Sequence, residues 1–187
     1  MRKLLEADDA ARGLLRVAGE IAERHRGTQK LMLVGIRRGG VPLATALKAQ
    51  LEALEPDHTI PLGTLDITLY RDDASTALPN PRIGASHMPV DVDGWSVILI
   101  DDVVGTGRSI RAALDALLDY GRPARVEVCA LVDRGGRELP ILVNYAVKKL
   151  EASSEERVDV HVHEGRISAM VMPLSAPSLY PPPVEEI

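Results

Sequence analysis

The chain has 187 residues, enough for one sizeable hydrophobic core but short for two independent domains. Hydrophobic residues make up 45% and charged residues 26%, a balance typical of soluble globular proteins that argues against a disordered, fibrous or membrane protein. Aromatic residues make up 3%, which nearly excludes aromatic platforms for stacking nucleic-acid bases. The formal net charge is −5, and the whole excess lies in residues 151–187, which carry seven acidic and two basic side chains.

The predicted elements of the first third of the chain begin with an amphipathic helix over 6–26. Apolar residues recur there at helical spacing, and Gly27 is a stop signal. A buried strand over 31–34, a glycine-rich turn over 35–40 and a helix over 41–54 follow. These three elements make half of a strand–helix–strand unit.

The next elements repeat the same order. An extended stretch over 60–70 leads into a long polar loop, and a continuous apolar strand over 95–100 precedes a helix that ends at Tyr120. A fourth strand is expected over 126–132. The repeated order of strand, glycine turn and helix favours an α/β fold with a mainly parallel sheet. Short strands are also expected over 145–147, 158–162 and 167–172.

The end of the chain is rich in proline. We expect one domain over 1–172 and a disordered proline-rich tail over 173–187, with recognition of a partner by the tail as the alternative. Cys129 lies in an apolar run and is expected to be a buried hydrophobic residue, which fits a reducing compartment. No signal peptide is evident, and no run approaches the roughly 18 apolar residues of a membrane helix. A cytoplasmic protein without membrane contact is therefore expected.

The strongest motif follows the strand over 95–100 and reads Asp101, Asp102, Val103, Val104, Gly105, Thr106, Gly107, Arg108, Ser109. In an open parallel sheet, ligands bind beyond the carboxyl ends of the strands, where this motif lies. Its backbone N–H groups, its two hydroxyls and the N-terminus of the next helix favour a phosphate dianion. The Gly-Lys-Ser/Thr ending of a Walker loop is absent. The motif therefore predicts a different kind of phosphate cradle.

Two acids precede this cradle and must face something other than phosphate, because like charges repel. Ribose hydroxyls or a magnesium ion would suit Asp101 and Asp102. Adjacent strand residues point to opposite faces, so two separate contacts are expected rather than an acid pair that shares a proton. The alternative is that the two acids only cap the following helix.

The motif closely resembles the binding motif for phosphoribosyl pyrophosphate (PRPP) of type I phosphoribosyltransferases. Further stretches are similar to the PyrR family of bifunctional pyrimidine operon regulators and uracil phosphoribosyltransferases: Asp66-Ile-Thr-Leu-Tyr-Arg-Asp-Asp73, Gly121-Arg-Pro123 and Leu131-Val-Asp-Arg-Gly-Gly-Arg-Glu-Leu-Pro-Ile141. The resemblance spans residues 31–162. It implies the type I phosphoribosyltransferase fold, with a mainly parallel sheet flanked by helices and a small hood formed by the N- and C-terminal segments.

The resemblance also implies a reaction and a regulatory role. The reaction converts uracil and PRPP to UMP and pyrophosphate, with magnesium (Mg2+) bound mainly through PRPP rather than by protein ligands. The regulatory role is uridine-nucleotide-dependent binding to the mRNA leader of a pyrimidine operon, which promotes transcription attenuation. A homodimer or higher homo-oligomer is implied as well. Two alternatives remain open: a phosphoribosyltransferase for a purine or orotate without RNA binding, and an RNA-binding regulator with vestigial catalysis.

The resemblance assigns residues to the catalytic site. Asp101 and Asp102 would bind the ribose hydroxyls, and Arg71 would start a mobile flap that keeps water from an oxocarbenium-like state. Asp133 and Arg134 would lie near uracil or the nucleotide, with a turn salt bridge as the alternative. No general base is evident. The pyrophosphate loop would consist of Arg37, Arg38, Gly39 and Gly40, and the 5′-phosphate loop of Val103, Val104, Gly105, Thr106, Gly107, Arg108 and Ser109.

RNA binding needs a basic face of its own. Leu15 and Gly19 occupy positions of the first helix where the family tends to carry polar or basic side chains, and Gly136 replaces a usual histidine. A solvated helix face is the alternative interpretation. The candidate RNA contacts are Arg12, Arg16, Arg24, Arg137 and Lys148, with Arg26 and Lys149 nearby.

Overall fold

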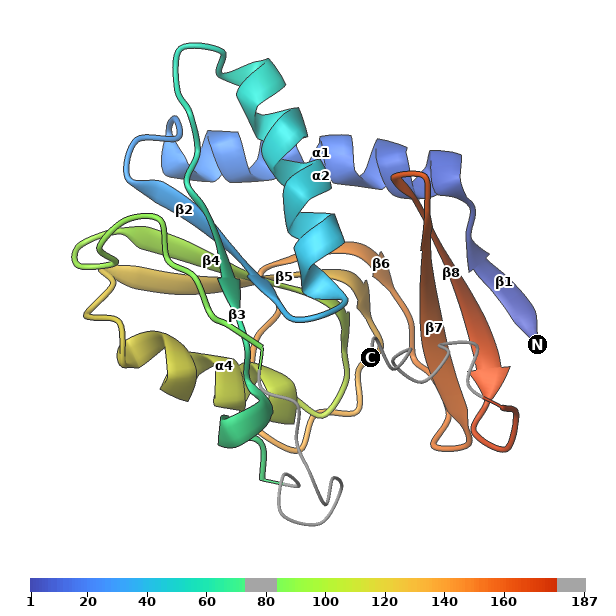
Figure 1. Cartoon of the computed structure of the whole chain (residues 1–187). Helices are drawn as coiled ribbons and strands as arrows, with labels where there is room; N and C mark the ends of the chain where they lie inside the picture. The colour runs from blue at the N-terminus through green and yellow to red at the C-terminus, as the bar shows by residue number, and fades with distance from the viewer. Residues whose placement is uncertain (73–83, 178–187) are drawn as a thin grey trace, which may run out of the picture.

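The computed structural model describes residues 1–72 and 84–177. Its main sheet has five parallel strands in the order β3-β2-β4-β5-β6 (Figure 1). The strands of the main sheet are β2 (Leu31–Ile36), β3 (Leu62–Leu65), β4 (Ser96–Val104), β5 (Arg125–Asp133) and β6 (Tyr145–Lys149). The helices are α1 (Ala7–His25), α2 (Gly40–Leu54) and α4 (Arg108–Leu118).

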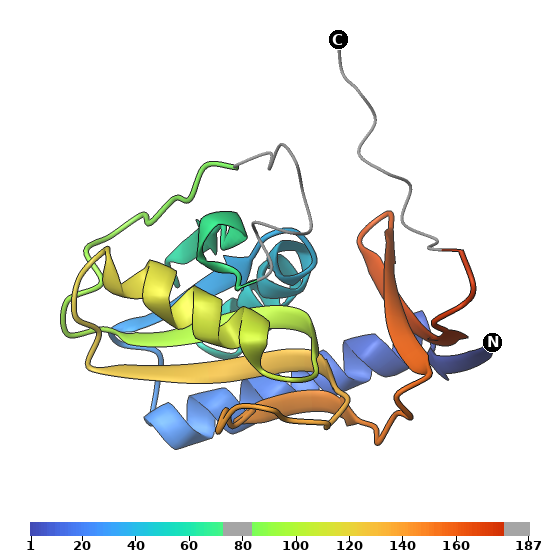
Figure 2. The same ribbon diagram turned by 90° about the horizontal axis from the view of Figure 1, so that it is seen from below.

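Helices cover both faces of the main sheet, so its central strands are apolar on both sides. On β4, Ile98 and Ile100 pack in one core cluster with residues of α1 and α2. Val97 and Leu99 point the other way and pack in a second cluster with residues of α4. Figure 2 shows α4 on one side of the sheet and α1 on the other. This three-layer arrangement confirms the predicted α/β fold.

The two ends of the chain form a second, antiparallel sheet, which we call the hood. It consists of β1 (Arg2–Leu5), β7 (Glu156–His163) and β8 (Arg166–Pro173) in the order β1-β8-β7. Figure 1 shows it beside the N-terminal part of α1, and α1 packs against both β8 and β6. The expected hood is therefore present. Strand β1 was not predicted, because four residues show too little alternation to mark a strand.

The stretch over 60–70 was expected to be extended throughout, and this is wrong. Only Leu62–Leu65 form a strand, and Thr68–Tyr70 form the 3-10 helix η1. The Asp66 carboxylate accepts the backbone N–H of Thr68 at 2.8 Å, a local turn that competes with strand pairing. The strand predicted over 95–100 instead continues to Val104, so Asp101 and Asp102 belong to β4 itself.

Strand β8 runs to Pro173, and the Arg157 guanidinium binds carbonyl oxygens between Pro173 and Pro177. The rest of the tail expected over 173–187 lies outside the described residues, as does the expected flap beyond Asp72, up to residue 83. Within the described ranges, no helix is long and apolar enough to cross a membrane.

Candidate active site

The turn after β2 lies directly on the two acids of β4. A Cβ atom added at Gly39 would be 2.0 Å from Asp102 Oδ2, and one added at Gly40 would be 2.0 Å from the carbonyl oxygen of Ile100. At Gly40 a side chain would collide with backbone, so the close approach there requires glycine, whereas a side chain at Gly39 would have to displace the Asp102 carboxylate. The pyrophosphate loop predicted from the sequence and the acid pair therefore meet at the carboxyl edge of the main sheet.

The acid pair lies in an environment that disfavours charge. Asp101 is 8% exposed and Asp102 is half-buried. Burial raises the pKa of Asp101 well above its usual range, the charge of Asp102 raises it further, and Arg71 offsets part of the shift. Burial also raises the pKa of Asp102. The two carboxyl groups thus influence each other although they are adjacent on a strand, and hydrogen-bond donors from a ligand would stabilise their charged forms.

The phosphate loop follows the acids and ends at a helix. Gly107 has a φ of 92° and immediately precedes α4, which starts at Arg108. The left-handed conformation at Gly107 favours glycine, and a Cβ atom there would also lie 2.9 Å from Ile141 Cγ1. The loop therefore places consecutive backbone amides next to a helix N-terminus, the arrangement that suits an anion.

The predicted pyrophosphate loop contributes two exposed arginines. Arg37 donates from Nη1 to the carbonyl oxygen of Ala85 at 3.0 Å, which ties the loop to the segment after the undescribed residues. Arg38 is exposed in the turn. Arg37 is thus bound within the chain, and Arg38 is open to solvent at the carboxyl edge of the sheet.

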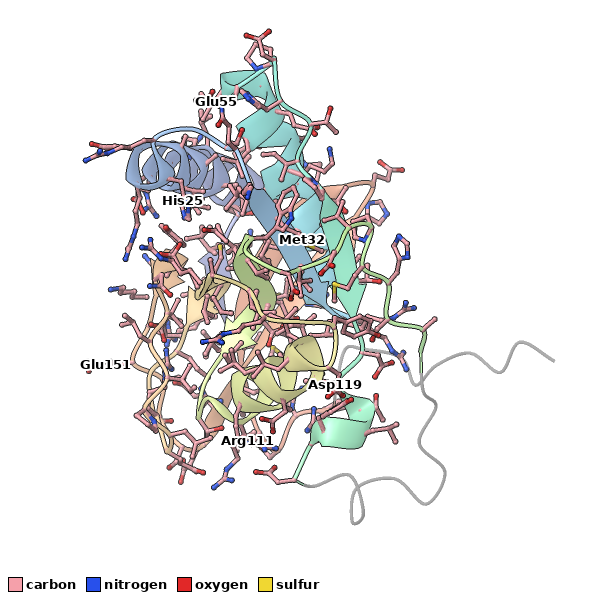
Figure 3. All side chains as sticks on the ribbon, turned by 90° about the vertical axis from the view of Figure 1, so that its left-hand side faces the viewer. His25, Met32, Glu55, Arg111, Asp119 and Glu151 are labelled. Atoms are coloured by element: carbon pink, nitrogen blue, oxygen red, sulfur yellow. The ribbon has the colours of Figure 1, made fainter. Side chains whose placement is uncertain are left out.

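Two arginines of α4 hold the segment that enters the expected flap. Arg111 donates to the carbonyl oxygen of Tyr70 at 2.6 Å, and the Tyr70 hydroxyl donates to Asp119. Figure 3 labels Arg111 on α4 and Asp119 directly after that helix. Arg108 pairs with Asp72 at 2.6 Å and with a second carboxylate, Glu138, at 2.7 Å. The Arg108 side chain is therefore directed at carboxylates, whereas its backbone belongs to the phosphate loop.

The end of β5 joins the same site. Asp133 Oδ1 accepts from Arg137 Nη2 at 2.6 Å and from the Gly135 N–H at 3.2 Å. The backbone N–H of Arg134 donates to the carbonyl oxygen of Val104 at 3.0 Å. The structure thus brings Asp133 and Arg134 to the phosphate loop. Asp133 also forms a salt bridge in the turn, as the alternative interpretation held, and its partner is Arg137.

The candidate RNA contacts do not gather in one free basic face. Arg12 pairs with Asp9 at 2.6 Å, and Arg16 pairs with Glu20 at 2.5 Å. Arg16 also donates to the carbonyl oxygens of Ala146 and Val147, which lie on β6. Arg24 Nε lies 3.2 Å from Glu127 Oε1, Arg137 donates to the carbonyl oxygen of Gly105 at 2.6 Å, and Lys148 is exposed on β6.

Sequence reasoning missed Glu138 and Asp72, the partners of Arg108. They lie 30 and 36 residues from it in the chain. No local pattern links residues so far apart, and only an arginine within a phosphate motif could have suggested a search for acidic partners.

Comparison with known proteins agrees with this geometry. The family described as phosphoribosyl transferase domain matches residues 5–163. The bifunctional protein PyrR of Roseiflexus sp. strain RS-1 is 50% identical over 163 residues, which cover 87% of this chain and 88% of the relative. The bifunctional protein PyrR of Deinococcus radiodurans is 46% identical over 161 residues, which cover 86% of this chain and 87% of the relative.

Solved structures share the fold at low sequence identity. The hypoxanthine phosphoribosyltransferase of Trypanosoma cruzi has a TM-score of 0.62 and 17% identity, covering 80% of this chain and 82% of that one. A hypoxanthine-guanine-xanthine phosphoribosyltransferase has a TM-score of 0.58 and 18% identity, and the match covers 80% of this chain and 79% of that chain. With the family match and the identity to PyrR proteins, these likenesses lead to one conclusion: the chain belongs to the phosphoribosyltransferase family and, within it, to the PyrR proteins.

Proposed function

We propose that this protein is a uracil phosphoribosyltransferase, which converts uracil and PRPP to UMP and pyrophosphate, and that it also regulates a pyrimidine operon. One observation carries the enzymatic part: an acid pair, the buried Asp101 and the half-buried Asp102, lies between the glycine turn after β2 and the phosphate loop. An anion-binding loop on each side of two carboxylates suits a ligand with a phosphate at each end and hydroxyls between them.

In the proposed complex, the ribose hydroxyls of PRPP donate to Asp101 and Asp102, and the 5′-phosphate lies in the loop from Val103 to Ser109. The pyrophosphate lies against the turn from Arg37 to Gly40. The bond from the anomeric carbon to pyrophosphate breaks while the bond to uracil N1 forms, and the N1 proton leaves to solvent or to pyrophosphate. Asp133 and Arg134, next to the phosphate loop, would adjoin the uracil ring.

Magnesium fits this site as an ion that enters with PRPP. No group of three or more histidine, cysteine or acidic side chains that could hold a metal occurs in residues 1–72 and 84–177. The two carboxylates of the acid pair are the oxygen donors near the proposed ligand, and oxygen is the ligand atom that magnesium prefers. When bound, magnesium would neutralise the charge that develops on the leaving pyrophosphate.

Arg71 would complete the closed site. Its charge lowers the pKa of Asp101, so the arginine and the acid pair interact electrostatically. Arg71 follows η1, which Arg111 ties to α4 through the carbonyl oxygen of Tyr70. An arginine held there is suited to offset the negative charge of a bound polyphosphate and to exclude water from the reacting carbon.

The enzymatic proposal is tested by measuring UMP formation from uracil and PRPP with magnesium, with hypoxanthine and orotate as competing substrates. We expect turnover with uracil alone. Full activity with hypoxanthine or orotate and none with uracil would replace the proposal with the purine or orotate alternative. No turnover with any base would leave the regulator with vestigial catalysis.

The regulatory part rests on the relatives, which are named bifunctional. We propose that the partner is the leader of a pyrimidine operon mRNA and that UMP strengthens binding. A gel-shift titration with the protein's own operon leader tests this. A shift that UMP strengthens at moderate salt supports it, and the absence of any UMP-dependent shift removes the regulatory role.

We also propose that residues 1–172 form one catalytic domain and that the cytoplasmic protein assembles as a homodimer or larger homo-oligomer. Light scattering on the purified protein tests the assembly. A mass equal to the 20.2 kDa of one chain at micromolar concentration would contradict it.

A further inference from the structure

Arg137 lies in the segment after β5, and its side chain is only 23% exposed. Its Nη1 donates to the carbonyl oxygens of Gly105 at 2.6 Å and Val104 at 3.4 Å, both in the phosphate loop. Its Nη2 donates to Asp133 at 2.6 Å, and its Nε donates to the carbonyl oxygen of Ile141 at 3.0 Å. One guanidinium thus joins the phosphate loop, the end of β5 and the segment that follows it.

The same segment binds every carbonyl oxygen of the phosphate loop from Val104 to Thr106. The carbonyl oxygen of Val104 accepts from the Arg134 N–H and from Arg137. That of Gly105 accepts from Arg137. That of Thr106 accepts from the Glu138 N–H at 3.0 Å and the Leu139 N–H at 3.3 Å.

This pattern determines which way the loop amides face. The peptide unit is planar and trans, so the N–H that follows each carbonyl points in the opposite direction. With three successive carbonyls turned toward the segment after β5, the N–H groups of Gly105, Thr106 and Gly107 turn away from it. A phosphate cradle needs its N–H groups on one side and its carbonyls on the other, because a carbonyl oxygen facing the anion would repel it.

We infer that Arg137 is a positioning residue, which holds the carbonyls of the phosphate loop away from the 5′-phosphate of PRPP. This inference rests on the proposed phosphoribosyltransferase function. Gly105 depends on Arg137 alone for the bond to its carbonyl oxygen, among the contacts described above. The planar guanidinium reaches acceptors in several directions at once, whereas a lysine ammonium is a single compact charge.

Two substitutions separate the charge of Arg137 from its geometry. Arg137→Lys keeps a cation opposite Asp133 but loses the guanidinium hydrogen bonds to the carbonyl oxygens of the loop. Arg137→Gln loses both the cation and these hydrogen bonds. We expect KM for PRPP to rise roughly tenfold in the lysine variant and up to roughly a hundredfold in the glutamine variant. The 5′-phosphate does not react, so kcat should change less than KM.

The matched control is Arg125→Gln. Arg125 begins β5 at the opposite edge of the sheet, and its side chain is 56% exposed. The KM of the Arg125→Gln variant for PRPP should equal that of the unsubstituted protein. Circular dichroism and thermal unfolding establish that each variant is folded. If the glutamine variant fails to fold, the lysine variant, which retains the pairing with Asp133, still gives the answer.

The outcomes distinguish the inference from the proposed function. If the unsubstituted protein forms no UMP from uracil, the proposed function fails first. If that protein is active and folded Arg137→Lys keeps its KM for PRPP, the inference is overturned. A variant that loses the RNA gel shift while its KM for PRPP is unchanged would also overturn it, and would assign Arg137 to RNA contact instead.

Discussion

Acidic side chains are buried at both edges of the main sheet, but their pKa values shift in opposite directions at the two edges. At the carboxyl edge, burial and the neighbouring charge of Asp102 raise the pKa of Asp101. At the amino edge, burial would raise the pKa of Glu127 on β5, but its partners outweigh burial and the pKa is lowered. The Glu127 side chain is 3% exposed, so it is buried at least as deeply as Asp101.

The partners of Glu127 explain the difference. His25 Nε2 lies 2.8 Å from its carboxylate, the Tyr145 hydroxyl donates to it at 2.9 Å, and Arg24 Nε lies 3.2 Å away. Figure 3 labels His25 at the end of α1. A carboxylate that the chain itself neutralises holds elements together, here α1, β5 and β6. The acids of the site, whose pKa values are raised mainly by burial, have too few cationic partners to offset it and are suited to receive hydrogen-bond donors from a ligand.

The largest expected effect tests the role of the acid pair. In Asp101→Asn with Asp102→Asn, we expect UMP formation to fall by roughly a hundredfold to a thousandfold, because the contacts proposed for the ribose lose their charge. The urea midpoint should stay the same or rise, because two carboxyl groups that disfavour folding at neutral pH are removed. Retained turnover in this variant would move the active site elsewhere.

The second prediction tests the close packing of the glycine turn against the acids. In Gly39→Ala the new methyl group would meet the Asp102 carboxylate, so we expect kcat/KM for PRPP to fall roughly tenfold or more. Gly19→Ala is the matched control, because nothing lies within 4 Å of the added Cβ atom and the residue is inside α1. It should leave turnover unchanged and add up to about 1 kcal/mol of stability. Equal turnover in both variants would refute the contact as a functional one.

The third prediction concerns the amino edge. Glu127→Gln should lower the free energy of unfolding by about 2 kcal/mol, because His25 and Arg24 lose their buried charged partner. UMP formation should not change, since Glu127 is at the far edge of the sheet from the site. Urea unfolding and steady-state turnover measure the two effects. A large loss of turnover with intact stability would show that the two edges are not functionally separate.

The smallest effect is a pair of opposite pH dependences. The folded-state pKa of Glu127 is lowered from 4.5, so its contribution to stability is present above that pH and is lost as the pH falls through the lower folded value. The difference in the free energy of unfolding between Glu127→Gln and the unsubstituted protein should therefore become smaller below pH 4.5.

The acid pair should show the opposite sign. The folded-state pKa of Asp101 is raised from 3.8, so its contribution is present below that pH and is lost as the pH rises through the folded value. The stability of the double asparagine variant relative to the unsubstituted protein should therefore increase as the pH rises from 3.8 toward neutrality. Urea unfolding across this range measures both trends, and trends of the same sign would contradict the comparison.

Much of the fold was predictable because its signals are local. The apolar run of β4, the glycine turn before α2 and the spacing of apolar residues in α1 each depend on neighbours in the chain. The acid pair and the phosphate loop were recognisable for the same reason. The error at 60–70 also has a local cause, since the carboxylate of Asp66 bonds a nearby N–H and turns the backbone into η1.

The long-range contacts were not predictable in this way. His25 and Glu127 lie 102 residues apart, and nothing in either local stretch marks them as partners. Arg137 was grouped with the RNA candidates on charge alone, and its contact with Gly105 crosses 32 residues. The strand β1 had no signal of its own, because it exists only by pairing with β8 at the other end of the chain.

The sequence by itself therefore indicated most of the elements of the main sheet, the family resemblance and the residues proposed to bind phosphate and ribose, since these depend on short patterns. Only the tertiary structure decided which charges are neutralised within the chain and which are left for a ligand. The physical reason is that the pKa of a buried carboxyl group depends on partners within a few ångströms in space, and folding draws those partners from distant parts of the chain.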